Sequence, residues 1–195
     1  MQKQISLEQY RRIDLSLFAL ILLVTEYLIV TAGRKWYPDQ LYTVSVTAAV
    51  TAIVYMRWGV RGGIHAFLGG IVFCFFSGGT LRQFLIYGAG NLFSLPAALA
   101  MRKAGPERVR EDQLLSLVFA AAVLLSMQAG RAVIAVLTGA SPSQALGFFT
   151  TDSLSLVFTL VVVWIVRRLD GVFEDQRHYL RRFHHEQEEE RTEQE

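Results

Sequence analysis

The stretch RQFLIYGAGNLFSLP, residues 82–96, decides the fold class, because it is apolar enough to enter a membrane yet carries a row of polar side chains. Gln83, Tyr87, Asn91 and Ser94 are separated by four, four and three residues, so on an α-helix they share one face. In hydrocarbon no water is available to hydrogen-bond these groups, and each needs a partner. The row therefore indicates either a polar cavity or polar packing between membrane helices.

The composition places the whole chain in the same class. It has 195 residues, 52% of them hydrophobic, and its charged residues are concentrated at the ends and in short loops. This pattern predicts an all-α integral membrane domain, residues 1–168, followed by a polar helical tail in the cytoplasm, residues 169–195. The net charge of +2 is too small to indicate a nucleic-acid partner. We expect a multi-pass protein of the plasma membrane, in contact with membrane lipid.

Six apolar segments predict six transmembrane helices, and the segment that contains the opening stretch is residues 81–101. The segment 62–76 is the shortest and is rich in glycine. The other five are residues 13–32, 41–56, 62–76, 113–137 and 145–166.

The distribution of Lys and Arg predicts the orientation of these helices. Of the 19 Lys and Arg residues, 15 lie in the leader, in the loops after the second and fourth segments, and in the tail. Cationic loops stay on the cytoplasmic side during insertion, so both the N-terminus and the C-terminus are predicted to be cytoplasmic.

With this orientation, polar residues from four segments lie in the outer half of the membrane. A charged residue at a helix centre costs roughly 2.5–3.5 kcal/mol on insertion scales, so it normally faces a partner or a cavity. Three interpretations stay open: an interhelical ion pair such as Arg131 with Asp152, a ligand pocket with both signs of charge, or a proton or ion path. The aromatic pair after the first segment lies on the same side and could either stack on a ligand or anchor in the interface. The candidate substrate-binding residues are Glu26, Trp36, Tyr37, Arg82, Gln83, Tyr87, Asn91, Gln128, Arg131, Thr151, Asp152 and Ser155.

The sequence carries no signature of catalysis or of a cofactor. The glycines around residues 59–70 follow no strand and precede no nucleotide-binding lysine, and His184 and His185 are adjacent rather than at a metal-ligand spacing. No nucleophile–histidine pair or set of metal ligands joins Glu26 or Asp152. We therefore expect no catalytic residue, no metal site and no cofactor, and we expect that the protein is not an enzyme.

The layout resembles the substrate-binding S component of the energy-coupling factor (ECF) transporters that take up vitamins. The resemblance rests on RWGVRGGIHAFLGG, residues 57–70, on YGAGN, residues 87–91, and on six short segments with both ends inside. In that family the loop after the first helix and the outer parts of the last three helices form the substrate site. The resemblance implies a transmembrane coupling protein and cytoplasmic ATPase subunits as partners. The Ala-x-x-x-Ala pattern common on the family's first helix is absent, because Ala19 is followed by Leu23.

Two functions follow as the main hypotheses, ahead of a third, an intramembrane enzyme that would use Glu26 or Asp152 as an acid or base. The first is a membrane-embedded subunit that binds a small polar or zwitterionic, vitamin-like metabolite from the extracellular side for uptake. The alternative is a noncatalytic membrane scaffold of the MreD-like type, which acts through protein contacts and in which the polar residues only hold helices together.

Overall fold

The structure is a computed structural model that describes residues 6–39, 42–169 and 172–173, and within those ranges it is helical, with no strand. Five helical stretches of 24 to 31 residues are long and apolar enough to cross a membrane, which takes about 20 residues. The predicted sixth crossing and the location of the termini stay predictions. Most of the predicted tail lies outside the described residues. The five stretches are Leu7–Trp36, Thr47–Ser77, Leu81–Ala104, Gln113–Leu137 and Pro142–Val166.

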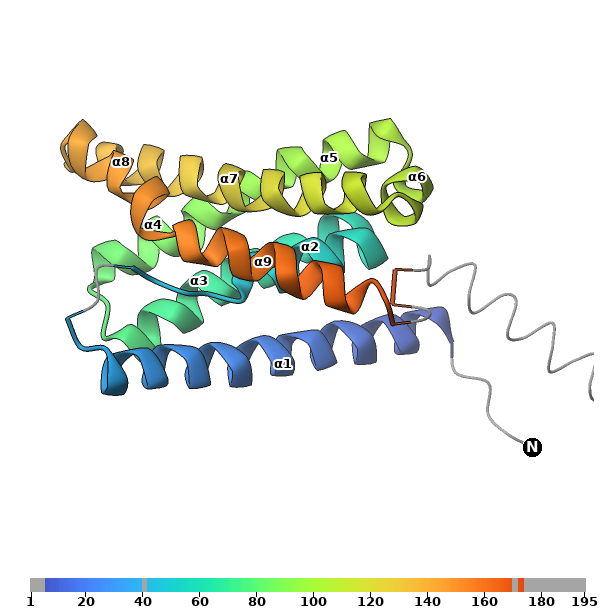
Figure 1. Cartoon of the computed structure of the whole chain (residues 1–195), viewed down its shortest axis with the longest axis horizontal. Helices are drawn as coiled ribbons and strands as arrows, with labels where there is room; N and C mark the ends of the chain where they lie inside the picture. The colour runs from blue at the N-terminus through green and yellow to red at the C-terminus, as the bar shows by residue number, and fades with distance from the viewer. Residues whose placement is uncertain (1–5, 40–41, 170–171, 174–195) are drawn as a thin grey trace, which may run out of the picture.

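Helix α1 (Leu7–Trp36) runs along one side of the bundle (Figure 1). Ser6 and Gln9 form a capping box at its start, in which the Ser6 Oγ accepts from Gln9 N at 3.3 Å and the Gln9 Oε1 accepts from Ser6 N at 3.1 Å. We refer to the two ends of the bundle as the Ser6 end and the Trp36 end. The side of α1 away from the bundle is apolar and would face lipid; its exposed residues include Ile13, Leu17, Leu20, Val24 and Leu28.

The stretch Thr47–Ser77 contains two helices rather than one, α2 (Thr47–Trp58) and α3 (Gly63–Ser77), joined by the 3₁₀ turn η1 (Gly59–Gly62). Gly59 has a φ of 62°, a left-handed conformation that glycine adopts easily. A Cβ on Gly62 would lie 2.5 Å from Tyr55 Cδ1, and one on Gly69 would lie 2.3 Å from Thr47 Cγ2. These contacts show that α2 and α3 run antiparallel, in close contact.

The hairpin explains why the predicted segments 41–56 and 62–76 do not form two further long helices. Its arms have 12 and 15 residues, fewer than a full crossing needs. All residues of α2 are buried inside the bundle, so this helix is surrounded by protein rather than lipid. The backbone before α2 is not helical, and it enters the bundle from the Trp36 end.

The predicted segment 81–101 is interrupted. Helix α4 (Leu81–Asn91) is followed by the 3₁₀ turn η2 (Leu92–Ser94) and then by α5 (Leu95–Ala104). The charged loop after it contains the short helix α6 (Pro106–Glu111). Helix α7 (Gln113–Leu137) has the predicted bounds. A Cβ on Gly130 of α7 would lie 2.1 Å from the carbonyl oxygen of Gly90, so glycines let α4 and α7 touch through their backbones.

The predicted segment 145–166 is also interrupted, since α8 (Pro142–Thr151) ends one residue before α9 (Ser153–Val166) begins. The residue between them is Asp152, which serves as the C-cap of α8 and the N-cap of α9. This break places a carboxylate inside the bundle, 3% exposed.

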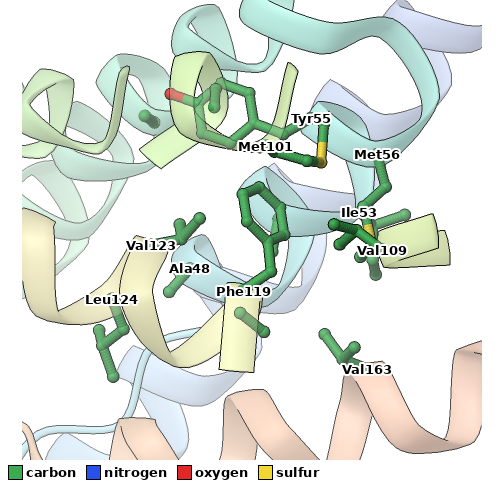
Figure 2. Packing of buried hydrophobic residues seen from close by; sticks show 14 of the residues in the cluster. Ala48, Ile53, Tyr55, Met56, Met101, Val109, Phe119, Val123, Leu124 and Val163 are labelled. Atoms are coloured by element: carbon green, nitrogen blue, oxygen red, sulfur yellow. The ribbon is translucent and has the colours of Figure 1, made fainter. Parts of the chain in front are cut away.

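The apolar core lies between α2, α5, α6, α7 and α9. Figure 2 shows Phe119 at its centre, with Tyr55, Met101 and Val123 around it. The Tyr55 and Phe119 rings meet edge to face with centroids 6.4 Å apart. Phe173, beyond α9, is also buried in this core, so the chain returns to the bundle at the Ser6 end.

Candidate functional site

A buried ion pair lies at the break between α8 and α9. Arg131 Nη1 on α7 donates to Asp152 Oδ2, and the two side chains are 3% and 5% exposed. The residues around this pair form the central polar cluster, defined here as Glu26, Thr43, Ser45, Tyr87, Asn91, Arg131, Asp152 and Ser155.

The Arg131 guanidinium also binds α4. Its Nε donates to Asn91 Oδ1 at 2.7 Å, and Asn91 Nδ2 donates in turn to the carbonyl of Ala66 on α3 at 2.9 Å. The guanidinium carbon lies 4.6 Å from the centroid of the Tyr87 ring, a cation–π contact. One arginine thus connects α7 with α3, α4 and the start of α9.

The second oxygen of Asp152 binds the non-helical segment before α2. Thr43 Oγ1 donates to Asp152 Oδ1 at 2.5 Å, and Thr43 N donates to the carbonyl of Thr151 at 2.9 Å. The Ser155 hydroxyl lies 3.3 Å from Asp152 Oδ1 and 3.2 Å from the carbonyl of Thr43, and it accepts from Ser45 N at 3.1 Å. The segment Thr43–Val46 is therefore held on the break between α8 and α9.

Glu26 on α1 holds the other side of the same segment. Its Oε2 accepts from Val46 N at 3.0 Å, and the Ser45 hydroxyl lies beside the carboxyl group. The side chain is 0% exposed, and Oε1 has no hydrogen-bond partner among the described residues. The hydroxyl oxygen of Thr47, which begins α2, is likewise buried without a partner in that part of the chain.

Two irregular segments and one 3₁₀ turn meet at the central polar cluster. They are the non-helical segment before α2, the break at Asp152, and the turn η2 after Asn91, where the chain stays helical but winds more tightly. Non-helical backbone at membrane depth is tolerated only where protein or a polar cavity surrounds it, and interrupted helices are a recurrent way to build ligand sites in transporters. The cluster combines a cation, two carboxylates and backbone groups, so it can bind either sign of charge.

The structure describes no side-chain hydrogen bond between the other residues predicted for the site and the cluster. Arg82 Nε donates to Thr138 Oγ1 at 3.1 Å, and Gln83 caps α4 by accepting from Thr80 N at 2.7 Å. Trp36 and Tyr37 are 69% and 64% exposed at the end of α1. Gln128 is buried on α7, whereas the Thr151 hydroxyl donates to the carbonyl of Gly147 at 2.9 Å; the structure gives neither side chain a contact with the ion pair.

A second buried charged group, at the Ser6 end, was missed from the sequence. Asp14 on α1 accepts from Arg57 Nη2 at 2.8 Å and from Trp58 Nε1 at 2.6 Å, both at the end of α2. Arg57 Nη1 donates to the carbonyl of Val172 at 2.7 Å. Asp14 is the second residue of the predicted segment 13–32, and an acidic residue inside a predicted crossing is a signal that the sequence did offer.

Neither the central polar cluster nor the charged group around Asp14 has the composition of a metal site. Within the described ranges, no group of three or more His, Cys, Asp or Glu side chains is placed to hold a metal ion.

Comparisons of the chain with protein-family models, with curated proteins and with solved structures find no match. Any functional proposal therefore rests on the geometry of the central polar cluster and of the charged group around Asp14.

Proposed function

We propose that the protein is a membrane-embedded substrate-binding subunit that takes up a small polar or zwitterionic metabolite from the extracellular side. The observation that carries this proposal is the central polar cluster beside the irregular backbone before α2 and at Asp152, where Glu26 Oε1 is buried without a partner in the described chain. A purely structural cluster gains nothing from an unpartnered carboxylate oxygen, because such an atom destabilises the folded protein. A ligand that binds there would supply the missing contact.

In this proposal the residues of the central polar cluster have different roles. Arg131 and Asp152 hold the α8–α9 break in place, and Asn91 fixes the direction of the guanidinium. The segment Thr43–Val46 lies against Glu26 and Ser155 and would move aside when a ligand enters. The protein performs no chemistry on the ligand, so energy for uptake would come from partners, namely a transmembrane coupling protein and cytoplasmic ATPase subunits.

The proposed function includes the orientation predicted from the sequence. The Trp36 end would be extracellular and the Ser6 end cytoplasmic. The proposed count of six treats the two short arms of the α2–α3 hairpin as passes enclosed by protein, each shorter than a crossing exposed to lipid. The Arg-rich α6 and the first residues after α9 lie near the Ser6 end, where Arg110 Nε donates to the carbonyl of Met56 at 2.7 Å. Cationic groups at this end agree with a cytoplasmic location in the plasma membrane.

A second candidate is the MreD-like membrane scaffold. It is favoured by the two ion pairs, Arg131–Asp152 and Arg57–Asp14, which are both buried and each bound by further donors or acceptors. In a scaffold these pairs would only join helices, and the function would depend on protein contacts made elsewhere on the surface.

Equilibrium dialysis distinguishes the two candidates. The purified protein is dialysed against a defined mixture of small cationic, anionic and zwitterionic metabolites, and the retained compounds are identified by mass spectrometry. We expect one compound to be retained at one per protein by the wild type, and to be retained much less by Asn91→Leu. Retention of no compound by a folded wild-type protein would contradict the binding function and favour the scaffold.

A further inference from the structure

The partners of the charged groups in the central polar cluster indicate which kind of ligand it would take. Arg131 is bound to Asp152, so these two charges compensate one another inside the bundle. Glu26 is the second carboxylic acid of the cluster, and its described partners are a backbone N–H and a neighbouring hydroxyl rather than a cation in direct contact. With Glu26 ionised, the cluster therefore carries one uncompensated negative charge.

Both atoms without partners can accept a hydrogen bond, and the Thr47 hydroxyl can also donate one. Glu26 Oε1 and Thr47 Oγ1 are both buried and unpartnered in the described ranges. The Ser45 hydroxyl connects the two residues, because it lies beside the Glu26 carboxyl and accepts from Thr47 N at 3.2 Å. An ammonium group has three N–H donors and no acceptor, and it carries the charge that Glu26 lacks. A carboxylate or phosphate ligand would instead meet an acidic group that repels it.

We propose that Glu26 binds the ammonium group of the substrate, so that the substrate class is a small primary amine or an amino-bearing zwitterion. This inference rests on the proposed binding function and adds the chemical class of the ligand. The Thr47 hydroxyl serves as a second acceptor for the same group. The ligand reaches Glu26 when the segment Thr43–Val46 moves away from the α8–α9 break.

The variant Glu26→Gln isolates the charge from the fold. Glutamine keeps an oxygen that can accept from Val46 N, so the segment before α2 stays anchored, while the negative charge is removed. Thr47→Val removes the second acceptor with little change of shape. The matched control is Thr159→Val on α9. The Thr159 hydroxyl is also buried and without a partner in the described chain, but Thr159 is not part of the central polar cluster.

The experiment is equilibrium dialysis against two defined mixtures, one of amino acids, polyamines and amino alcohols, and one of the same compounds after N-acetylation. The sodium and potassium concentrations are the same in both mixtures. A difference in retention between the mixtures therefore reflects the free amino group and not these metal cations. We expect the wild type and Thr159→Val to retain one amine. Glu26→Gln should bind that amine about ten- to a hundredfold more weakly, as loss of a hydrogen bond to a charged group predicts. Thr47→Val should bind it more weakly by a smaller factor.

The outcomes are distinct. Retention of the same amine by Glu26→Gln at wild-type affinity, or equal retention of its N-acetylated form, would overturn the assignment of Glu26. Glu26 would then be a protonated acid rather than an ammonium site. Retention of only a compound without an amino group would overturn the ligand class but leave the binding function standing. Retention of nothing from these mixtures or from the mixed-charge set above would contradict both proposals.

Discussion

The guanidinium of Arg57 donates two hydrogen bonds to the carboxylate of Asp14, from Nη2 to Oδ1 at 2.8 Å and from Nε to Oδ2 at 3.0 Å. The two side chains are 7% and 10% exposed, and Trp58 Nε1 adds a third donor. Such two-pronged, charge-assisted pairs are among the stronger polar contacts in proteins. This pair joins the first turns of α1 to the end of α2, and through Val172 it also holds the chain beyond α9.

Asp14→Leu is expected to lower the free energy of unfolding by about 3–5 kcal/mol, because it leaves Arg57 buried without its carboxylate. Trp58→Phe, which removes only one donor, should cost less. The measurement is denaturant unfolding in detergent micelles. Glu8→Gln, a change to an exposed acid at the start of α1, is the control and should have little effect. An Asp14→Leu variant as stable as the control would show that the pair contributes nothing to stability.

The pair Arg131–Asp152 is predicted to show strong coupling. Arg131→Leu and Asp152→Leu should each lower stability by about 3–5 kcal/mol, since each leaves a buried charge alone, and the double variant should recover most of the loss. Thermal unfolding of the four proteins measures the coupling. Small losses in both single variants would mean that water solvates the remaining charge. Ligand binding measured on the same proteins should be lost in all three variants; binding that is unchanged in all of them would show that this pair only joins helices and is not part of the ligand site.

Gly130→Ala is expected to destabilise the protein by about 1–3 kcal/mol, because the added Cβ would lie 2.1 Å from the carbonyl oxygen of Gly90 and would push α4 and α7 apart. The matched control is Gly147→Ala in α8, where nothing lies within 4 Å of the added Cβ. Alanine should stabilise that helix by about 0.5–1 kcal/mol. Thermal unfolding should shift in opposite directions for the two variants. A shift in the same direction would contradict the contact between the two helix backbones.

Cysteines placed at Ser141 and Pro106 should react with a membrane-impermeant reagent from opposite sides of the membrane, with Ser141 labelled from outside. The two positions lie beyond opposite ends of α7, which is long enough to cross a membrane. The wild-type protein serves as the background control, because its one cysteine, Cys74, is buried. Equal labelling of both introduced cysteines in intact cells would refute the predicted orientation.

The sequence predicts helices well where local signals are strong. The bounds of α7 follow from an apolar run of 25 residues that begins after Asp112, whose side chain caps it by accepting from Leu114 N at 2.7 Å. The interruptions at η2 and at Asp152 were missed, because apolar composition continues through them. The break at Asp152 involves contacts with a distant segment, such as that of Thr43 with Asp152, which no local pattern contains. The turn η2 has a local signal, because Pro96 at the start of α5 has no N–H to donate to the carbonyl of Leu92.

The candidate site was predicted in part for the same reason. The spacing of polar residues in α4 correctly places Tyr87 and Asn91 on one face, but it also includes Gln83, which the structure assigns to the helix cap. The motif Thr80-x-x-Gln83 is a capping signal and could have separated the two roles. Glu26 accepts from the backbone N–H of Val46. Every residue except proline has such an N–H, so the amino-acid sequence does not indicate this partner.

The segment Thr43–Val46 has a consequence for the motions of the protein. Its three bonded amides have three different acceptors: Thr43 N binds Thr151, Ser45 N binds Ser155 and Val46 N binds Glu26. No amide in this set is paired within a helix, so the segment can separate from the bundle without unwinding one. Such a segment opens as a single unit, and its three amide hydrogens would exchange with solvent at a common rate, well before those of α2.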